Sequence, residues 1–159
     1  MTYPIWDVRA AQYLAVFAHA GQVDKAGLPY IHHPKRVAWA VQDHPGLERM
    51  SKAERATALM VAWLHDVLED TAVTKQMLQD LGCPEDVIWR VQRLSRSNDV
   101  VDSYYYAMIR ADEICLLVKE CDINDNANPG RLSLLNKDTQ RGLVRTYTTA
   151  RRALGLEIA

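Results

Sequence analysis

Four polar residues that can do chemistry together follow an apolar run in the middle of the chain: His65, Asp66, Glu69 and Asp70 come directly after residues 56–64. A helix turns about 100° per residue, so side chains three and four positions apart share a face. A lone His-Asp pair is most simply a solvated helix end. Imidazole nitrogen and carboxylate oxygen are also ligands for first-row divalent metal ions, and the remaining carboxylates can orient or deprotonate a metal-bound water.

Two residues elsewhere extend this pair to a candidate metal site. His33 lies in the segment 29–38 and Asp122 in the segment 118–126, each at the edge of an expected helix. A mixed, oxygen-rich ligand set with open positions favours manganese or a similar ion over closed tetrahedral zinc. The sequence therefore predicts a divalent metal ion, Mn²⁺ by preference, held by four ligands: His33, His65, Asp66 and Asp122.

The order of these four residues resembles that of the HD superfamily of metal-dependent phosphohydrolases. The flanking segments are similar to the hydrolase domain of RelA/SpoT-type alarmone enzymes, whose substrate is guanosine tetraphosphate. The resemblance runs from about residue 10 to residue 128 and lies in three blocks: Ala18-His19-Ala20-Gly21-Gln22 with Lys25-Ala26-Gly27 and Pro29-Tyr30-Ile31; residues 64–71; and Lys119, Asp122 and Asn126 in the spacing Lys-x-x-Asp-x-x-x-Asn.

The resemblance implies an all-α, single compact HD-type helical bundle that hydrolyses a phosphoric ester or pyrophosphate bond of a small phosphorylated nucleotide. Glu69 and Asp70 would position the attacking water or take its proton. Four further residues would contact the substrate, the lysines as point charges, the asparagine by hydrogen bonding and the tyrosine by stacking: Lys25, Lys119, Asn126 and Tyr104. The two lysines also fit solvated or supporting positions.

One position departs from the family pattern where the substrate base is recognised. The alarmone hydrolases have an arginine that contacts guanine just before the lysine of this loop, and this chain has Asp24 there. A carboxylate can accept a hydrogen bond from an exocyclic amine but repels phosphate. Three functions stay open: hydrolysis of guanosine 3′-pyrophosphate, the same chemistry on another nucleotide or phosphorylated metabolite, and non-enzymatic nucleotide sensing. If Asp24 faces the base, Asp24→Arg is expected to favour guanosine 3′-pyrophosphates.

Helices are the elements that must position these residues. Apolar side chains recur with helical spacing, and Ser51 with Glu54 forms a capping-box pattern ahead of the segment that ends in the His-Asp pair. No segment alternates with period two for long, so no sheet is expected. The expected helices span residues 5–20, a short stretch from His33, 52–68, 74–81, a stretch opened by Pro84, 101–110, 111–122 and 137–154.

Length and composition limit the partners. The 159 residues suit one domain, 1–159, and the net charge of −1 argues against nucleic acid or an acidic membrane surface as a partner. No apolar run approaches the roughly 20 residues of a membrane span, and residues 1–7 show no signal-peptide pattern. The three cysteines have no ligand-like spacing. We therefore expect a cytoplasmic protein with a small-molecule substrate; its oligomeric state is left open.

Overall fold

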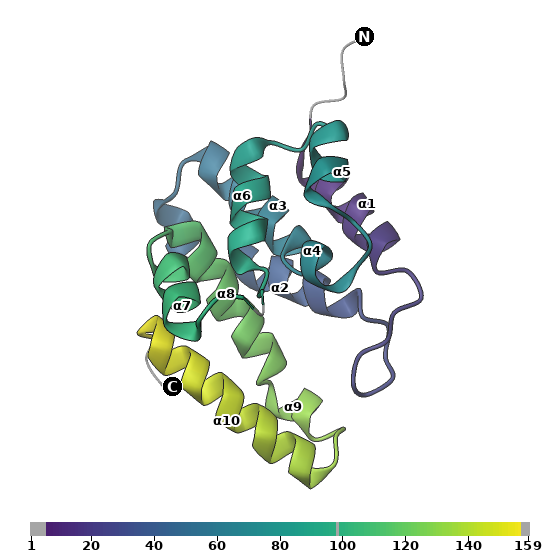
Figure 1. Cartoon of the computed structure of the whole chain (residues 1–159), viewed down its shortest axis with the longest axis vertical. Helices are drawn as coiled ribbons and strands as arrows, with labels where there is room; N and C mark the ends of the chain where they lie inside the picture. The colour runs from purple at the N-terminus through teal and green to yellow at the C-terminus, as the bar shows by residue number, and fades with distance from the viewer. Residues whose placement is uncertain (1–5, 98, 157–159) are drawn as a thin grey trace.

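The computed structural model describes residues 6–97 and 99–156, and over these residues it is helical (Figure 1). The only β-pairing in this part of the chain is one isolated bridge between Val23 and Pro29. This confirms the expected all-α class. The elements are α1 (Val8–Ala18), α2 (His32–Gln42), η1 (Pro45–Arg49), α3 (Lys52–Leu64), α4 (Val67–Asp70), α5 (Lys75–Asp80), α6 (Glu85–Leu94), α7 (Asp102–Arg110), α8 (Glu113–Asn126), α9 (Pro129–Leu132) and α10 (Lys137–Leu154).

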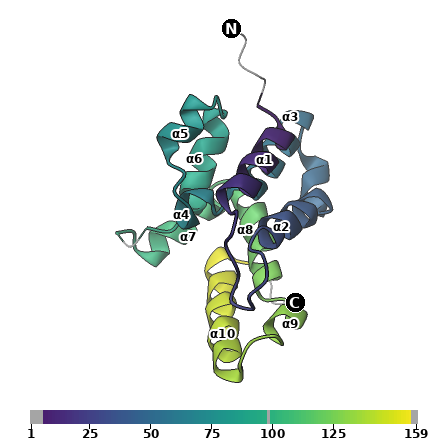
Figure 2. The same ribbon diagram turned by 90° about the vertical axis from the view of Figure 1, so that its right-hand side faces the viewer.

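Helix α3 is the central element of the core and packs against α1, α2, α6 and α8 (Figures 1 and 2). It begins at the expected capping box, in which the Ser51 hydroxyl accepts from the Glu54 amide and the Glu54 carboxylate accepts from the Ser51 amide. Ala58, Val61 and Leu64 are fully buried. Burial of this apolar stripe fixes the position of the residues that follow α3.

The chain turns at His65 and Asp66, where the sequence had predicted one continuous helix over 52–68. Helix α3 ends at Leu64 and α4 starts at Val67. At Asp66 the ψ angle is −5°, far from the helical value of about −42°. In a continuous helix two adjacent side chains would diverge by about 100°. The turn allows His65 and Asp66 to reach the same point in space.

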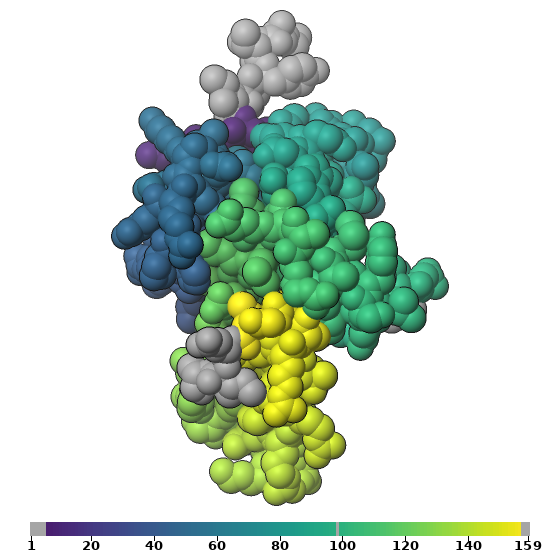
Figure 3. All heavy atoms as spheres, turned by 90° about the vertical axis from the view of Figure 1, so that its left-hand side faces the viewer, coloured from purple at the N-terminus to yellow at the C-terminus, as the bar shows by residue number. Residues whose placement is uncertain are grey.

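The C-terminal helices lie at one end of the molecule, away from α1 and α5 (Figures 1 and 3). Helix α10 has the predicted bounds, because the Asn136 side chain caps its first turn and Gly155 ends it with a φ of +71°. Helix α8 runs one turn beyond the predicted end at Asp122, and the short helix α9 was not predicted. The longer α8 places Asp125 and Asn126 on the same helix as Asp122.

The N-terminal helix is shorter than predicted. Asp7 caps α1 by accepting from the amides of Arg9 and Ala10, so the helix begins at Val8 and ends at Ala18. The predicted start at Ile5 lies outside the described residues. None of the described helices combines the length and the apolar character needed to cross a membrane.

Candidate metal centre and pocket

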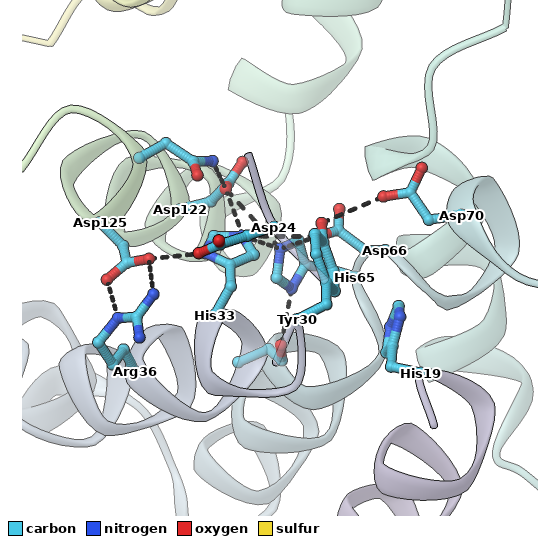
Figure 4. Close-up of polar contacts among 12 residues, drawn as sticks. His19, Asp24, Tyr30, His33, Arg36, His65, Asp66, Asp70, Asp122 and Asp125 are labelled. Atoms are coloured by element: carbon cyan, nitrogen blue, oxygen red, sulfur yellow. Dashed lines mark hydrogen bonds and ion pairs between the residues drawn. The ribbon is translucent and has the colours of Figure 1, made fainter. Parts of the chain in front are cut away.

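His33, His65 and Asp66 come together between α2 and the α3–α4 turn (Figure 4). The Nε2 atoms of the two histidines are 3.3 Å apart. Asp66 Oδ2 is 3.1 Å from His65 Nε2 and 3.4 Å from His33 Nε2. Ligands about 2.1 Å from one ion, at angles between octahedral and tetrahedral, are roughly 3.0–3.4 Å apart. The three donor atoms therefore have the spacing of metal ligands.

Hydrogen bonds on the outer side of each imidazole fix which nitrogen faces the cluster. His65 Nδ1 is 2.8 Å from the Ala62 carbonyl oxygen and His33 Nδ1 is 2.7 Å from Asp125 Oδ2. A carbonyl or carboxylate oxygen can only accept, so both Nδ1 atoms donate. In the neutral rings the two Nε2 lone pairs then face each other and the Asp66 carboxylate. A cation is the group that satisfies three converging acceptors.

Asp122 lies beside this cluster. Its Oδ1 is 3.1 Å from His33 Nε2 and 3.8 Å from His65 Nε2. The same oxygen accepts from Asn126 Nδ2 at 2.6 Å, and Oδ2 is 2.8 Å from Lys119 Nζ. Among the described residues, His33, His65 and Asp66 form a group whose donor atoms all lie within 4.8 Å of one another, and Asp122 is not part of it. Asp122 is adjacent to it, with its carboxylate held by a lysine and an amide.

The cluster attracts positive charge. Burial by itself lowers the pKa of His65, but the carboxylates of Asp66 and Asp122 outweigh it and raise the pKa to about 9. The pKa of His33 is raised against burial in the same way. Burial opposes ionisation of the two aspartates, yet the charge of His65 on Asp66, and of Lys119 on Asp122, lowers their pKa well below the ordinary value. The carboxylates of the cluster thus favour positive charge among them, whether as protons or as a divalent ion.

Glu69 and Asp70 lie on α4, which directly follows the cluster residue Asp66. Glu69 Oε2 accepts from the Arg96 amide at 2.7 Å. Although Glu69 is exposed as a residue, desolvation of this carboxyl group, together with the charges of Asp66 and Asp70, raises its pKa. Tyr30 donates to Asp66 Oδ2 at 2.7 Å and approaches Asp70 Oδ2 at 3.1 Å. Sequence reasoning gave Tyr30 no role, although its Pro-Tyr-Ile motif was part of the resemblance.

Two hollows open on either side of Glu69. The larger has a volume of about 490 Å³ and the smaller about 200 Å³. Four residues line both: Tyr30, Glu69, Asn126 and Tyr147. The larger hollow combines polar side chains with an apolar wall from the C-terminal segment, and its members include Asp24, Lys25, His33, Asp70, Arg131, Leu132, Leu135 and Leu143. A mixed cavity of this size suits a nucleotide-sized ligand.

The predicted substrate contacts fall in different places. Lys25 and Asn126 line the larger hollow, and Lys119 lines the smaller one. Tyr104 lies apart from both; it is 57% exposed and lines a separate depression with Trp89. Tyr147 of α10 lines both hollows instead. No motif surrounds Tyr147 in the sequence, so only the packing of α10 against α7 and α8 reveals it.

Asp24 has partners of its own. Its Oδ1 accepts from the amides of Ala26 and Leu28 at 2.9 and 3.0 Å, which shapes the loop. Its Oδ2 is 3.2 Å from a guanidinium nitrogen of Arg131 on α9. An arginine therefore does reach this side of the hollow, from a different element, and its charge is matched by Asp24 and Asp125.

Known proteins resemble this chain in sequence and in fold. The chain matches no protein-family model. It is 40% identical over 74 residues to the bifunctional (p)ppGpp synthase/hydrolase SpoT of Escherichia coli K12, which covers 46% of this chain and 9% of that protein. It is 37% identical over 82 residues to a probable guanosine-3′,5′-bis(diphosphate) 3′-pyrophosphohydrolase of Synechocystis, 50% of this chain and 10% of the relative. The chain thus spans about a tenth of the length of these curated relatives.

A solved structure extends the likeness to the whole fold. It belongs to a metazoan ortholog of SpoT that hydrolyzes ppGpp, and it superposes with a TM-score of 0.71 at 20% identity over 97% of this chain and 88% of that one. The resemblance found in the three sequence blocks is therefore confirmed. The chain has the all-α fold of this SpoT ortholog and is similar, over about half its length, to guanosine-3′,5′-bis(diphosphate) 3′-pyrophosphohydrolases.

Proposed function

We propose that this protein is a metal-dependent phosphohydrolase that removes pyrophosphate from the 3′ position of a guanosine 3′-pyrophosphate. The observation that supports it most directly is the convergence of two Nε2 atoms and the Asp66 carboxylate beside a nucleotide-sized hollow that Lys25 and Asn126 line. The curated relatives named as hydrolases of this substrate point the same way.

The residues present fit a divalent ion. His33, His65 and Asp66 would hold it. Asp122 would be the fourth ligand once its Oδ1 gives up the hydrogen bond from Asn126 to bind the ion. The balance of two nitrogen and two oxygen donors favours Mn²⁺. When bound, such an ion lowers the pKa of its water and polarises a phosphoryl group. Tyr30 keeps Asp66 in place, since burial and the charges of Asp66 and Asp70 raise its pKa and keep its hydroxyl a donor.

Glu69 is the proposed general base. The pKa of Glu69 is raised toward neutral pH, and a general base is most effective when its pKa lies near the pH at which the enzyme works. The hydrogen bond from the Arg96 amide fixes its orientation. Asp70, whose Oδ2 lies 3.1 Å from the Tyr30 hydroxyl, would hydrogen-bond and orient the water that Glu69 deprotonates.

Substrate binding is divided between charge and shape. Lys25 would neutralise a phosphate in the larger hollow, and Lys119, fixed on Asp122, would add positive charge on the smaller side. Asn126 would hydrogen-bond the ribose or a phosphate. We place Tyr147, in preference to Tyr104, as the aromatic contact, because Tyr147 lines both hollows.

The three cysteines are free and buried, which agrees with a reducing, cytoplasmic setting.

A second candidate is hydrolysis of a different phosphorylated nucleotide at the same centre. The observation that favours it is Asp24, which stands in place of the family's arginine and pairs with Arg131. A carboxylate-guanidinium pair presents an acceptor and a donor together, and so reads a base edge differently from a lone arginine.

A release assay separates the two. The purified chain is stripped of metal, reloaded with Mn²⁺ and tested for phosphate and pyrophosphate release from guanosine tetraphosphate, nicotinamide dinucleotide phosphates and simple nucleotides. Pyrophosphate released selectively from guanosine tetraphosphate supports the first function. Preference for another compound supports the second. Metal-dependent release from none of them contradicts hydrolysis of these nucleotides and favours a sensor.

A further inference from the structure

Helices α2 and α8 face each other with matching pairs of residues three positions apart. His33 and Arg36 lie on one face of α2, and Asp122 and Asp125 lie on the facing side of α8. His33 contacts both aspartates: Nε2 lies 3.1 Å from Asp122 and Nδ1 lies 2.7 Å from Asp125. The two aspartates of α8 thus contact the His33 ring at its two nitrogens (Figure 4).

The bond between His33 and Asp125 differs from its counterpart on the second histidine. His65 donates to a neutral backbone carbonyl, whereas His33 donates to a carboxylate. Only 3% of the His33 side chain and 9% of the Asp125 side chain are exposed. A hydrogen bond to a charged acceptor, shielded from water, is stronger than one between neutral groups and draws electron density toward Nε2.

Two arginines hold the Asp125 carboxylate in its place. Arg36 donates to both oxygens, at 2.6 and 3.1 Å, and Arg131 donates to Oδ2. Two guanidinium groups and the hydrogen bond from His33 favour the ionised form of this carboxylate. The same contacts occupy both oxygens of Asp125. Asp125 is therefore placed to act on His33.

We propose that Asp125 is a positioning residue for His33: it fixes the ring with Nδ1 protonated, aims the Nε2 lone pair at the cluster and strengthens that nitrogen as a metal donor. The inference rests on the proposed function, since it needs a metal at His33. Arg36 and Arg131 act one step further out by immobilising Asp125. Loss of such a partner typically weakens metal binding roughly 10- to 100-fold.

The test is a metal titration of the Asp125→Asn variant. The amide oxygen can still accept from His33 Nδ1 but carries no charge, so the bond to His33 is kept and its charge is removed. Manganese affinity of the metal-free proteins is measured by calorimetry, with folding checked by circular dichroism. We expect the Mn²⁺ dissociation constant of Asp125→Asn to rise roughly 10- to 100-fold. Asp43→Asn is the matched control: it makes the same change at the exposed C-terminal end of α2, outside both hollows, and its Mn²⁺ affinity should equal that of the wild type.

The outcomes separate this inference from the proposed function. A wild type that binds no manganese sinks the proposed function itself. Wild-type and Asp125→Asn proteins that bind manganese equally well overturn the positioning role alone. If Asp125→Asn does not fold, NMR of the ¹⁵N-histidine-labelled wild type tests the role, with diamagnetic Zn²⁺ bound in place of paramagnetic Mn²⁺. The Nδ1 proton of His33 should be shifted downfield and protected from exchange with solvent. An Nδ1 proton that exchanges freely would overturn the role.

Discussion

Each imidazole of the candidate centre is fixed through the nitrogen that faces away from it. The Ala62 carbonyl fixes His65 and the Asp125 carboxylate fixes His33, so both Nε2 atoms are aimed at one point beside Asp66. The donor atoms of His33, His65 and Asp66 already lie within 4.8 Å of one another. Changes to single side chains of the candidate centre should therefore have separable effects.

Removal of one ligand is expected to abolish metal binding. His65→Ala should reduce the metal content from about one ion per chain to near zero, because three ligands of the proposed four make a poor site and leave a buried carboxylate charge unbalanced. Elemental analysis after dialysis measures this. His32→Ala is the matched control, since His32 is exposed next to a ligand and belongs to no cluster among the described residues. Full metal content in His65→Ala would show that the ligand assignment is mistaken.

Replacement of the proposed base should separate chemistry from metal binding. Glu69→Gln keeps an oxygen that accepts from the Arg96 amide but cannot take a proton. We expect turnover to fall by roughly 10²-fold or more with metal content unchanged. The same change at Glu85, at the start of α6 and outside both hollows, should have no effect. Near-normal turnover in both Glu69→Gln and Asp70→Asn would place the base elsewhere.

Packing between helices brings together residues that are distant in sequence. The turn between α3 and α4 brings His65 and Asp66 together, and α2 and α8 bring His33 against Asp122 and Asp125. The loop between α1 and α2 supplies one wall of the larger hollow, and α9 and α10 supply the other. The proposed substrate hollow is thus formed by segments that share no local motif.

The pairing of Asp24 with Arg131 changes what an arginine at position 24 is expected to do. Asp24→Arg loses two hydrogen bonds that shape the loop and places two guanidinium groups together. We expect a stability loss of about 1–3 kcal/mol, seen as a fall in Tm on the order of 5 °C, and no gain for guanosine 3′-pyrophosphates. Asp24→Asn keeps the acceptor oxygen and should lose less.

Thermal unfolding and relative kcat/KM values for guanosine tetraphosphate and a second nucleotide test this pair of variants. A stable Asp24→Arg protein with improved selectivity for guanosine tetraphosphate would support the expectation drawn from the family pattern alone. It would also mean that Arg131 moves away without cost.

At the scale of the whole molecule, the charges of the cluster link stability to pH. A group whose pKa is raised by folding stabilises the fold below its ordinary pKa and loses that contribution as the pH rises through the folded value. The pKa of His65 rises from 6.5 to about 9 in the metal-free fold. The free energy of unfolding of the metal-free protein should therefore fall as the pH rises from about 6.5 to 9.

Urea titrations at fixed ionic strength measure this dependence, with and without Mn²⁺. Saturating metal should remove most of the fall, because deprotonated imidazoles bind the ion more tightly as the pH rises. Metal at 100 times its dissociation constant should also add about 2.7 kcal/mol to the free energy of unfolding. A metal-free protein that becomes more stable between pH 6.5 and 9 would contradict the raised pKa.

The sequence alone determined the helical class, most helix positions and the motif residues of the candidate centre, because these follow from short-range information. The 3.6-residue periodicity, the capping box at Ser51 and the cap and stop at Asn136 and Gly155 act within a turn or two of the chain. Local patterns of this kind also placed His65, Asp66 and the carboxylates after them in one segment.

The contacts that support that centre join residues far apart in the sequence and could not be predicted from it. The bond from His33 to Asp125 joins residues 92 positions apart, and the contact of Arg131 with Asp24 joins residues 107 positions apart. Tyr147 enters the hollow because α10 packs across α7 and α8. The turn at Asp66 likewise interrupts a segment whose local pattern is helical. Such contacts depend on how buried faces pack and on which buried charges find partners, and neither is encoded in the neighbours of a residue along the chain.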